Sequence, residues 1–219
     1  MQESSLHLAL KDWYLRQGGV AEARVAGFEI DVLQDGLLIE IQTRHFHAIR
    51  PKLERLLPEH RIRLVHPIAR EKWIVRLPVS SEEPLSRRRS PRHGRLEHIF
   101  LELVRIPTLA LHPNLTVEVL ITSEEEIRRL DGKGSWRRQG VSIADRRLLT
   151  VLESRLFNSP GDYRTLLPAS LPELFTNRDL AVAAALALPL ATRMTYCLRA
   201  MGILALEGKR GRASLYRLI

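Results

Sequence analysis

Apolar and polar residues alternate over residues 28–43, and this pattern predicts two strands joined by a tight turn. Asp35-Gly36 lies at the centre and suits a two-residue type I′ turn, because both turn positions need a positive φ. That turn fixes the register and sets Asp31 opposite Glu40. Since side chains alternate between the faces of a strand, we expect one apolar and one polar face. The apolar face would carry Ile30, Val32, Ile39 and Ile41, and the polar face Glu29, Asp31, Glu40 and Gln42.

Periodic patterns also predict the elements around this hairpin. Residues 4–17 carry a helical apolar stripe that Gly18-Gly19 ends, and residues 44–57 form an amphipathic helix with a basic outer side. Residues 20–25, 61–65 and 72–77 alternate as strands do. A helix, three antiparallel strands, a second helix and further strands predict an α+β arrangement with one sheet.

The composition shifts to Pro, Ser and Arg over residues 79–95, which is typical of a linker or an exposed loop. Its arginines would either contact phosphates or form a solvated tether. These are Arg87, Arg88, Arg89, Arg92 and Arg95. Beyond them we predict a helix over 96–109 and a strand over 115–123, and residues 124–130 either extend that strand or form a short helix. Trp136, among basic residues, would stack on a base or hold its own loop.

The last part of the chain predicts three helices and a hairpin. The first helix covers 142–157, the second lies within 175–188 and is capped by Thr176 and Asp179, and the third covers 190–202. Strands at 203–207 and 213–219 then flank a basic turn. This is the order of a winged helix-turn-helix, whose third helix would read the major groove while the basic turn follows the phosphates. The candidate DNA-binding residues are Thr192, Arg193, Thr195, Tyr196, Arg199, Lys209, Arg210 and Arg212; Met194, Cys197 and Met201 are expected in the core. The alternative is a winged helix that binds protein.

Composition narrows the class of partner. The net charge of +9 over 219 residues favours an anionic partner such as nucleic acid or an anionic membrane surface, and the alternative is a merely basic protein. Cys197 is the single cysteine, which excludes an intrachain disulfide and a cysteine-rich zinc site and fits a reducing cytoplasm. The start of the chain lacks a signal-peptide pattern, and the longest apolar run, 180–192, is shorter than the about 20 residues that span a bilayer. We therefore expect a cytoplasmic protein without membrane insertion.

Asp31 and Glu40 are the candidate chemical centre. Two carboxylates directly opposite each other destabilise a strand pair unless a cation, a shared proton or a divalent metal compensates. Mg²⁺ prefers carboxylate oxygens and keeps several waters, one of which can become a nucleophile. The alternative is a solvated polar face that tolerates two acids.

The strand with Asp31, the hairpin, the sequence IEIQ with Glu40 and Gln42, and the helix that follows resemble the PD-(D/E)xK nuclease superfamily over residues 1–78. The resemblance implies a restriction-endonuclease-like α/β core, Mg²⁺ or Mn²⁺ on Asp31 and Glu40, and cleavage of DNA. Gln42 stands where the family has lysine and would position water or phosphate. The missing charge could come from Lys52, Arg44 or His45. A solvated helix face is the alternative for Lys52.

The resemblance also bears on the two ends of the chain. In the superfamily an acid on the first helix often joins the metal site, which would be Glu3, and a frayed terminus is the alternative. A nuclease-like core joined to a winged helix also resembles an uncharacterised bacterial protein family.

These observations divide the chain into a nuclease-like core (1–78), a basic linker (79–95), a connecting region (96–140) and a winged helix-turn-helix (141–219). The expected function is double-stranded DNA binding with Mg²⁺-dependent cleavage, in which Asp31, Glu40, Gln42 and Lys52 form the catalytic set. One alternative is a non-catalytic transcriptional regulator with an inactive core, which the absent motif lysine favours. Another is an interaction module of a defence or repair complex. A homodimer is compatible with each.

Overall fold

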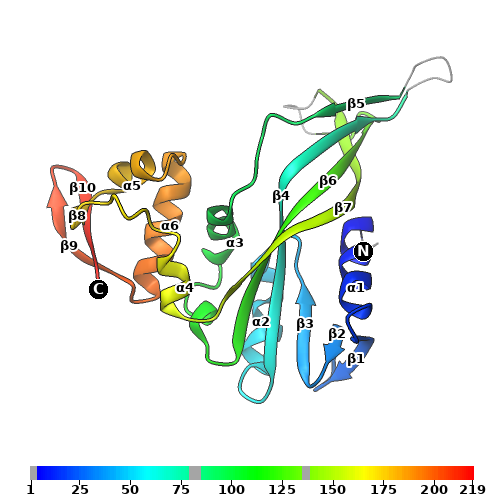
Figure 1. Cartoon of the computed structure of the whole chain (residues 1–219), viewed down its shortest axis with the longest axis horizontal. Helices are drawn as coiled ribbons and strands as arrows, with labels where there is room; N and C mark the ends of the chain where they lie inside the picture. The colour runs from blue at the N-terminus through cyan, green and yellow to red at the C-terminus, as the bar shows by residue number, and fades with distance from the viewer. Residues whose placement is uncertain (1–3, 79–84, 135–138) are drawn as a thin grey trace.

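The computed structural model of the chain describes residues 4–78, 85–134 and 139–219 (Figure 1). Within them, the dominant element is a mixed seven-stranded sheet of order β1-β2-β3-β4-β6-β7, with β5 paired to β4. The pairs β3–β4 and β4–β6 are parallel, and the others are antiparallel. The strands are β1 (Val20–Val25), β2 (Phe28–Gln34), β3 (Leu37–Ile41), β4 (Arg61–Arg76), β5 (Ser86–Arg89), β6 (Leu115–Leu130) and β7 (Val141–Phe157).

Helices cover both faces of this sheet. On one face α1 (Ser5–Leu15) packs Leu6, Leu10 and Tyr14 against the strands. On the other face lie α2 (Phe46–Leu56) and the short α3 (Phe100–Leu103), which stands between two 3₁₀ turns, η1 (Leu96–Ile99) and η2 (Leu109–Leu111). The helices predicted at 4–17 and 44–57 are confirmed, whereas the one predicted at 96–109 is broken into these short pieces.

The predicted hairpin is confirmed at its turn. Asp35 and Gly36 have φ of 48° and 75°, and the ladder pairs Val32 with Ile39, as the type I′ turn requires. The prediction of one apolar face is wrong. Val32, Ile39 and Ile41 pack on the α1 side, but Ile30 packs on the α2 side. The alternation changes at Asp31, where the β1–β2 ladder is also interrupted and the opposing Glu22 has φ of 54°.

The segment predicted as a helix at 142–157 is strand β7, which pairs with β6 along its length. The prediction is wrong because the apolar residues of β7 are spaced as in a helix, and this spacing arises where the β6–β7 ladder skips three residues of β7. Two of them, Leu149 and Leu152, lie at register shifts of the kind that a bulge produces. Each shift inserts one residue, so leucines three and four positions apart imitate a helical stripe.

Two further strand predictions change. Residues 61–65 and 72–77 belong to one continuous strand, β4, with an irregularity between Ala69 and Glu71. Residues 124–130 extend β6, which was one of the two alternatives.

The prediction of a linker over 79–95 is wrong for residues 86–89, which form β5 and pair with the end of β4. Arg87 and Arg89 are ion-paired to Glu125 and Glu71 at 2.7 and 2.8 Å, and Arg95 to Glu97 at 2.6 Å. These three arginines are therefore engaged in ion pairs within the fold. Glu3 and the loop residues Trp136, Arg137 and Arg138 lie outside the described residues.

A smaller unit follows β7. It contains α4 (Pro160–Arg164), β8 (Leu174–Phe175), α5 (Asn177–Ala183), α6 (Leu188–Ala200), β9 (Leu204–Arg210) and β10 (Ala213–Leu218). Its antiparallel strands have the order β8-β10-β9. The predicted cap of α5 is confirmed, since Thr176 and Asp179 bond reciprocally. Because residues 141–157 belong to the large sheet, this unit begins after β7 and not at residue 141.

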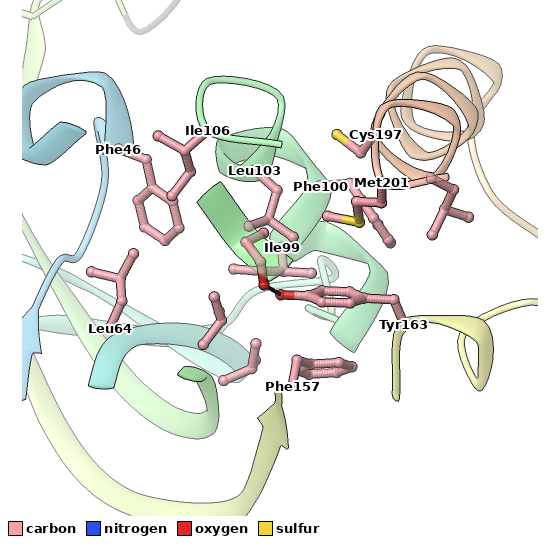
Figure 2. Close-up of a cluster of buried hydrophobic side chains, with 14 of the residues drawn as sticks. Phe46, Leu64, Ile99, Phe100, Leu103, Ile106, Phe157, Tyr163, Cys197 and Met201 are labelled. Atoms are coloured by element: carbon pink, nitrogen blue, oxygen red, sulfur yellow. Dashed lines mark hydrogen bonds between the residues drawn. The ribbon is translucent and has the colours of Figure 1, made fainter. Parts of the chain in front are cut away.

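The two parts share one hydrophobic core, which Figure 2 shows around Ile99, Phe100 and Leu103. Phe46 and Leu64 approach this group from the sheet side, and Cys197 of α6 and Met201 directly after α6 approach it from the other side. Tyr163 of α4 stacks on Phe157 at the end of β7, with ring centroids 5.1 Å apart. The C-terminal unit is thus packed on the sheet.

No single helix in the described part of the chain is long and apolar enough to cross a membrane. One bent pair, α5 with α6 at 114°, meets the length and composition criteria only when its two helices are taken together.

Candidate functional site

The two candidate acids lie where β2 and β3 separate. The β2–β3 ladder ends at Val32 and Ile39, one step before Asp31 and Glu40. The Asp31 carboxylate accepts a hydrogen bond from the Ile41 N–H at 2.8 Å, and the Glu40 carboxylate accepts one from the Asp31 N–H. Each acid therefore bonds the main chain of the opposite strand. We call this pair, Asp31 and Glu40, the acid fork.

Lys52 reaches the acid fork from α2. Its Nζ lies 2.5 Å from Glu40 Oε1 and also donates to the carbonyl of Glu29. The side chain is only 18 % exposed, so the interpretation of Lys52 as part of a solvated face is wrong. The sequence held a signal for this position, because Lys52 borders the buried stripe of Ile49 and Leu53.

His7 and Lys11 of α1 approach the acid fork from the opposite face of the sheet. His7 Nε2 lies 3.3 Å from Asp31 Oδ2. Lys11 is buried, pairs with Glu22 at 3.4 Å and contributes positive potential at Asp31. Neither residue is among those that the sequence predicts for the site. Their i, i+4 spacing beside the buried Leu6 and Leu10 was the available signal.

The two acids of the fork differ in electrostatic environment. Burial alone would raise the pKa of Asp31, but hydrogen bonds from His7 and from the Ile41 N–H hold it below its usual range. Burial raises the pKa of Glu40 to about 7, against the opposing effect of Lys52 and with a further increase from the charge of Asp31. Asp31 is therefore ionised at neutral pH, whereas Glu40 exchanges its proton near neutrality.

Gln42 lies at the end of β3, but its side chain bonds the loop that leads into α2. Its Nε2 donates to the carbonyl of Arg44 at 2.6 Å and to that of His45 at 3.4 Å. Arg44 lines a polar cavity of about 500 Å³. His45 adopts a left-handed backbone with φ of 65° and its ring contacts His47. The positive charge that meets the fork from α2 and its preceding loop comes from Lys52.

The donor set of the fork can be compared with the needs of Mg²⁺. In the part of the chain that the structure describes, no group of three or more His, Cys, Asp or Glu side chains is arranged to hold a metal. Asp31 and Glu40 offer carboxylate oxygens, which Mg²⁺ accepts when water or substrate completes its octahedral shell. Two protein carboxylates thus fit this ion, although Glu40 would share its oxygens with Lys52.

The predicted DNA-binding residues divide into exposed and engaged groups. On α6 the side chains of Thr192, Arg193, Tyr196 and Arg199 are exposed. The prediction that Thr195 faces outward is wrong, since it is 1 % exposed. Its hydroxyl donates to Asn177 Oδ1 at 2.7 Å, which holds α6 against α5. Buried Met194, Cys197 and Met201 confirm the predicted core stripe.

The β9–β10 hairpin carries the remaining basic residues. Lys209 and Arg212 are exposed near its tip. Arg210 folds back, and its guanidinium lies 3.3 Å from Asp179 Oδ2 and donates to the carbonyl of Leu174. Arg210 therefore fastens the hairpin to the start of α5, and Lys209 and Arg212 lack an ion-pair partner among the described residues. With Arg193, Tyr196 and Arg199 of α6, these two form what we call the basic face.

Comparisons with known proteins give relatives without an assigned activity. An uncharacterised protein of Treponema pallidum (strain Nichols) is 34 % identical over 220 residues, which cover 99 % of this chain and 85 % of the relative. No solved structure matches the chain. A family model described as a domain of unknown function, DUF8091, matches residues 4–158, so its boundary coincides with the end of β7. The chain therefore belongs to the DUF8091 family.

Proposed function

We propose that the protein binds double-stranded DNA and cleaves its phosphodiester backbone at the acid fork with Mg²⁺ or Mn²⁺. The observation that carries this proposal is the contact of Lys52 with Glu40. The motif that IEIQ resembles has a lysine where this chain has Gln42. Lys52 brings an ammonium group to Glu40 from the following helix instead. Acid, acid and cation, the set that phosphodiester cleavage needs, are thus together in one place.

The roles of the residues follow from their surroundings. Asp31, which stays ionised, and Glu40 would hold the metal. When bound, Mg²⁺ would polarise the phosphate and acidify a water. Lys52 would stabilise negative charge on the phosphate, and His7 positions the Asp31 carboxylate. Gln42 bonds the loop before α2, so we assign it a positioning role.

The C-terminal unit supports the DNA-binding half of the proposal. A two-residue strand, two helices and a hairpin in the order β8-β10-β9 match the arrangement of a winged helix. In such modules the second of these helices enters the major groove and the hairpin contacts phosphates. The basic face occupies these two positions.

A cleavage assay tests the catalytic half. Supercoiled, linear and branched DNA are incubated with Mg²⁺ or Mn²⁺ and with wild type, Asp31→Asn, Glu40→Gln and Lys52→Met. We expect cutting by wild type and a loss of roughly 100-fold or more in each variant, as for removal of a group that stabilises transition-state charge. Arg50→Ala is the matched control, since Arg50 lies on the same helix in an exposed pair with Glu54. Equal cutting by all proteins would refute the site.

A binding assay tests the other half. Fluorescence anisotropy with a labelled duplex should show weaker binding for Arg193→Ala and Arg199→Ala. The affinity should also depend less steeply on salt, because a complex with fewer phosphate contacts releases fewer counterions when it forms. Arg16→Ala removes the same charge from α1, where Arg16 pairs with Asp12, and should change little. If the control weakens binding as much, the basic face is not the contact surface.

A second candidate function is DNA binding without cleavage, as in a transcriptional regulator. The observation favouring it is that each acid of the fork bonds the main chain of the opposite strand, so that the pair also has a structural role. Salt-sensitive binding by a folded protein that never cuts would select this function. Failure of both assays would favour an interaction module for an acidic protein.

A further inference from the structure

Strand β7 forms one edge of the large sheet, and the start of α1 lies against part of it, at Asp145. It is 17 residues long and pairs only with β6 among the described strands. Four large apolar side chains on it, Ile143, Leu149, Leu152 and Leu156, are 37–46 % exposed. An edge strand with unpaired main-chain groups and exposed leucines is a template for pairing with another strand. The other edge, β1, has six residues.

The charges along β7 are symmetric about Thr150. Asp145 and Arg155 lie five residues on either side of it, and Arg147 and Glu153 lie three residues on either side. In the β6–β7 ladder these four stand opposite Ile127, Val119, Glu125 and Ile121. Because these partners are alternate positions of β6, Arg147, Glu153 and Arg155 share one face of the sheet, whereas the Asp145 carboxylate turns toward Ser5 at the start of α1.

We propose that β7 pairs antiparallel with β7 of a second copy of this chain, about a two-fold axis at Thr150. A two-fold axis normal to the sheet keeps each face on its own side. Arg147 then stands opposite Glu153 of the second copy, and Asp145 stands opposite Arg155. Symmetry repeats both pairs, so that four opposite-charge pairs flank the axis. Leu148 meets Leu152, and Leu149 meets Val151, which covers exposed apolar surface.

The charges select this register over its neighbours. A shift that moves the axis to Leu149 would set Asp145 against Glu153, and a shift to Val151 would set Arg147 against Arg155. Like charges directly opposite each other destabilise a strand pair, while opposite charges stabilise it. Shifting the register by a single residue would set Arg147 opposite Leu152 or Ser154 and would lose its contact with Glu153. Pairing at Thr150 avoids all of these conflicts.

The existing contacts of these residues leave the interface available. Arg147 and Arg155 are exposed and have no ion-pair partner among the described residues. Glu153 pairs with Arg70 at 2.7 Å, and both side chains stay partly exposed, so that a second cation can approach Glu153. Asp145 accepts hydrogen bonds from Ser5 at the start of α1. The pair of Arg147 with Glu153 is therefore the principal contact, and that of Asp145 with Arg155 is secondary.

Sedimentation velocity of the full chain over a wide concentration range tests this interface. We expect a monomer–dimer equilibrium in wild type. Arg147→Glu and Glu153→Arg should each raise the dimer dissociation constant at least about tenfold, because each reversal introduces two like-charge pairs. The double variant Arg147→Glu/Glu153→Arg restores opposite charges and should recover most of the affinity. Arg24→Glu, the same change on the exposed face of β1, should leave it unchanged.

Two outcomes would overturn the proposal. Wild type that stays monomeric throughout would show that β7 does not pair. A dimer that neither single reversal weakens, or that the double variant fails to recover, would place the contact elsewhere. Circular dichroism checks that each variant is folded, and none of the substituted side chains is buried. The result is independent of whether the protein binds or cuts DNA.

Discussion

The two halves of the long strands achieve burial in different ways. In the half that α2 and α3 cover, the residues of β4 and β6 that face these helices are mostly apolar, and Leu64, Val117 and Val119 are fully buried. In the half that extends beyond these helices (Figure 1), β6 buries Glu124 and Glu126 instead. Arg146 and Arg128 hold these acids at 2.6 Å. Beyond α2 and α3, long charged side chains cover one another.

The difference between the halves has an energetic consequence. Apolar burial stabilises roughly in proportion to the area removed from water and depends little on salt. A buried ion pair depends on both partners, because removing one leaves a desolvated charge. We define the arm as the part of β4, β6 and β7 beyond α2 and α3, together with β5. Its stability should therefore be sensitive to single charge deletions.

The largest effect is expected in the covered half. Phe100→Ala removes a fully buried side chain from the core that joins α3 to the sheet and to α6 (Figure 2). The free energy of unfolding should fall by about 3–5 kcal/mol, from lost transfer energy and the cavity left behind. Urea unfolding measures the change. Leu101→Ala, at a 39 % exposed neighbour, is the control, and an equal loss there would contradict this account of the core.

A comparable or slightly smaller effect is expected in the arm. Arg146→Ala leaves Glu124, which is 0 % exposed, without its cation, and Thr122 alone still bonds the carboxylate. We expect a loss of about 3 kcal/mol, measured by the same urea unfolding. Replacing both partners, Arg146→Leu with Glu124→Leu, should recover most of that loss, since no charge is then buried. A single variant as stable as wild type would show that the pair is not needed.

The smallest expected effect is a dependence of the free energy of unfolding on pH, caused by the buried carboxyl group of Glu40. Its pKa is raised from 4.5 to about 7, so the folded state holds the proton more tightly than the unfolded state. Its contribution to stability is fully present below pH 4.5 and is lost as the pH rises through 7, by at most about 3 kcal/mol. Chemical unfolding between pH 4.5 and 8 should show this slope. Glu40→Gln should remove the slope, and Glu54→Gln, an exposed acid on α2, should keep it.

The features that could be predicted from the sequence are those that depend on residues close together in the chain. The turn at Asp35-Gly36, the cap at Thr176 and the buried stripe of α6 depend on neighbours within a few residues, and all three are confirmed. Strand β7 depends on its pairing with β6, and its irregular register imitates a helix. The arginines of β5 find acids on β4 and β6 that are distant in the sequence.

The candidate site shows the same limit. Local turn chemistry predicts that Asp31 and Glu40 lie near each other, and that proximity is found. The contact of Lys52 with Glu40 depends on how α2 packs on the sheet. The contact of His7 with Asp31 depends in the same way on how α1 packs on it. Thr195 was misplaced because its burial depends on contact with Asn177 of another helix.

The continuous core around Phe100 fixes the distance between the large sheet and the C-terminal unit. Phe46 at the start of α2 and Met201 directly after α6 are joined through packed side chains and not through a flexible tether. The separation between the acid fork and the basic face is therefore a fixed length. A duplex gripped at α6 would present the same backbone position to Asp31 at every encounter, and any cut would fall at a constant offset from the bound segment.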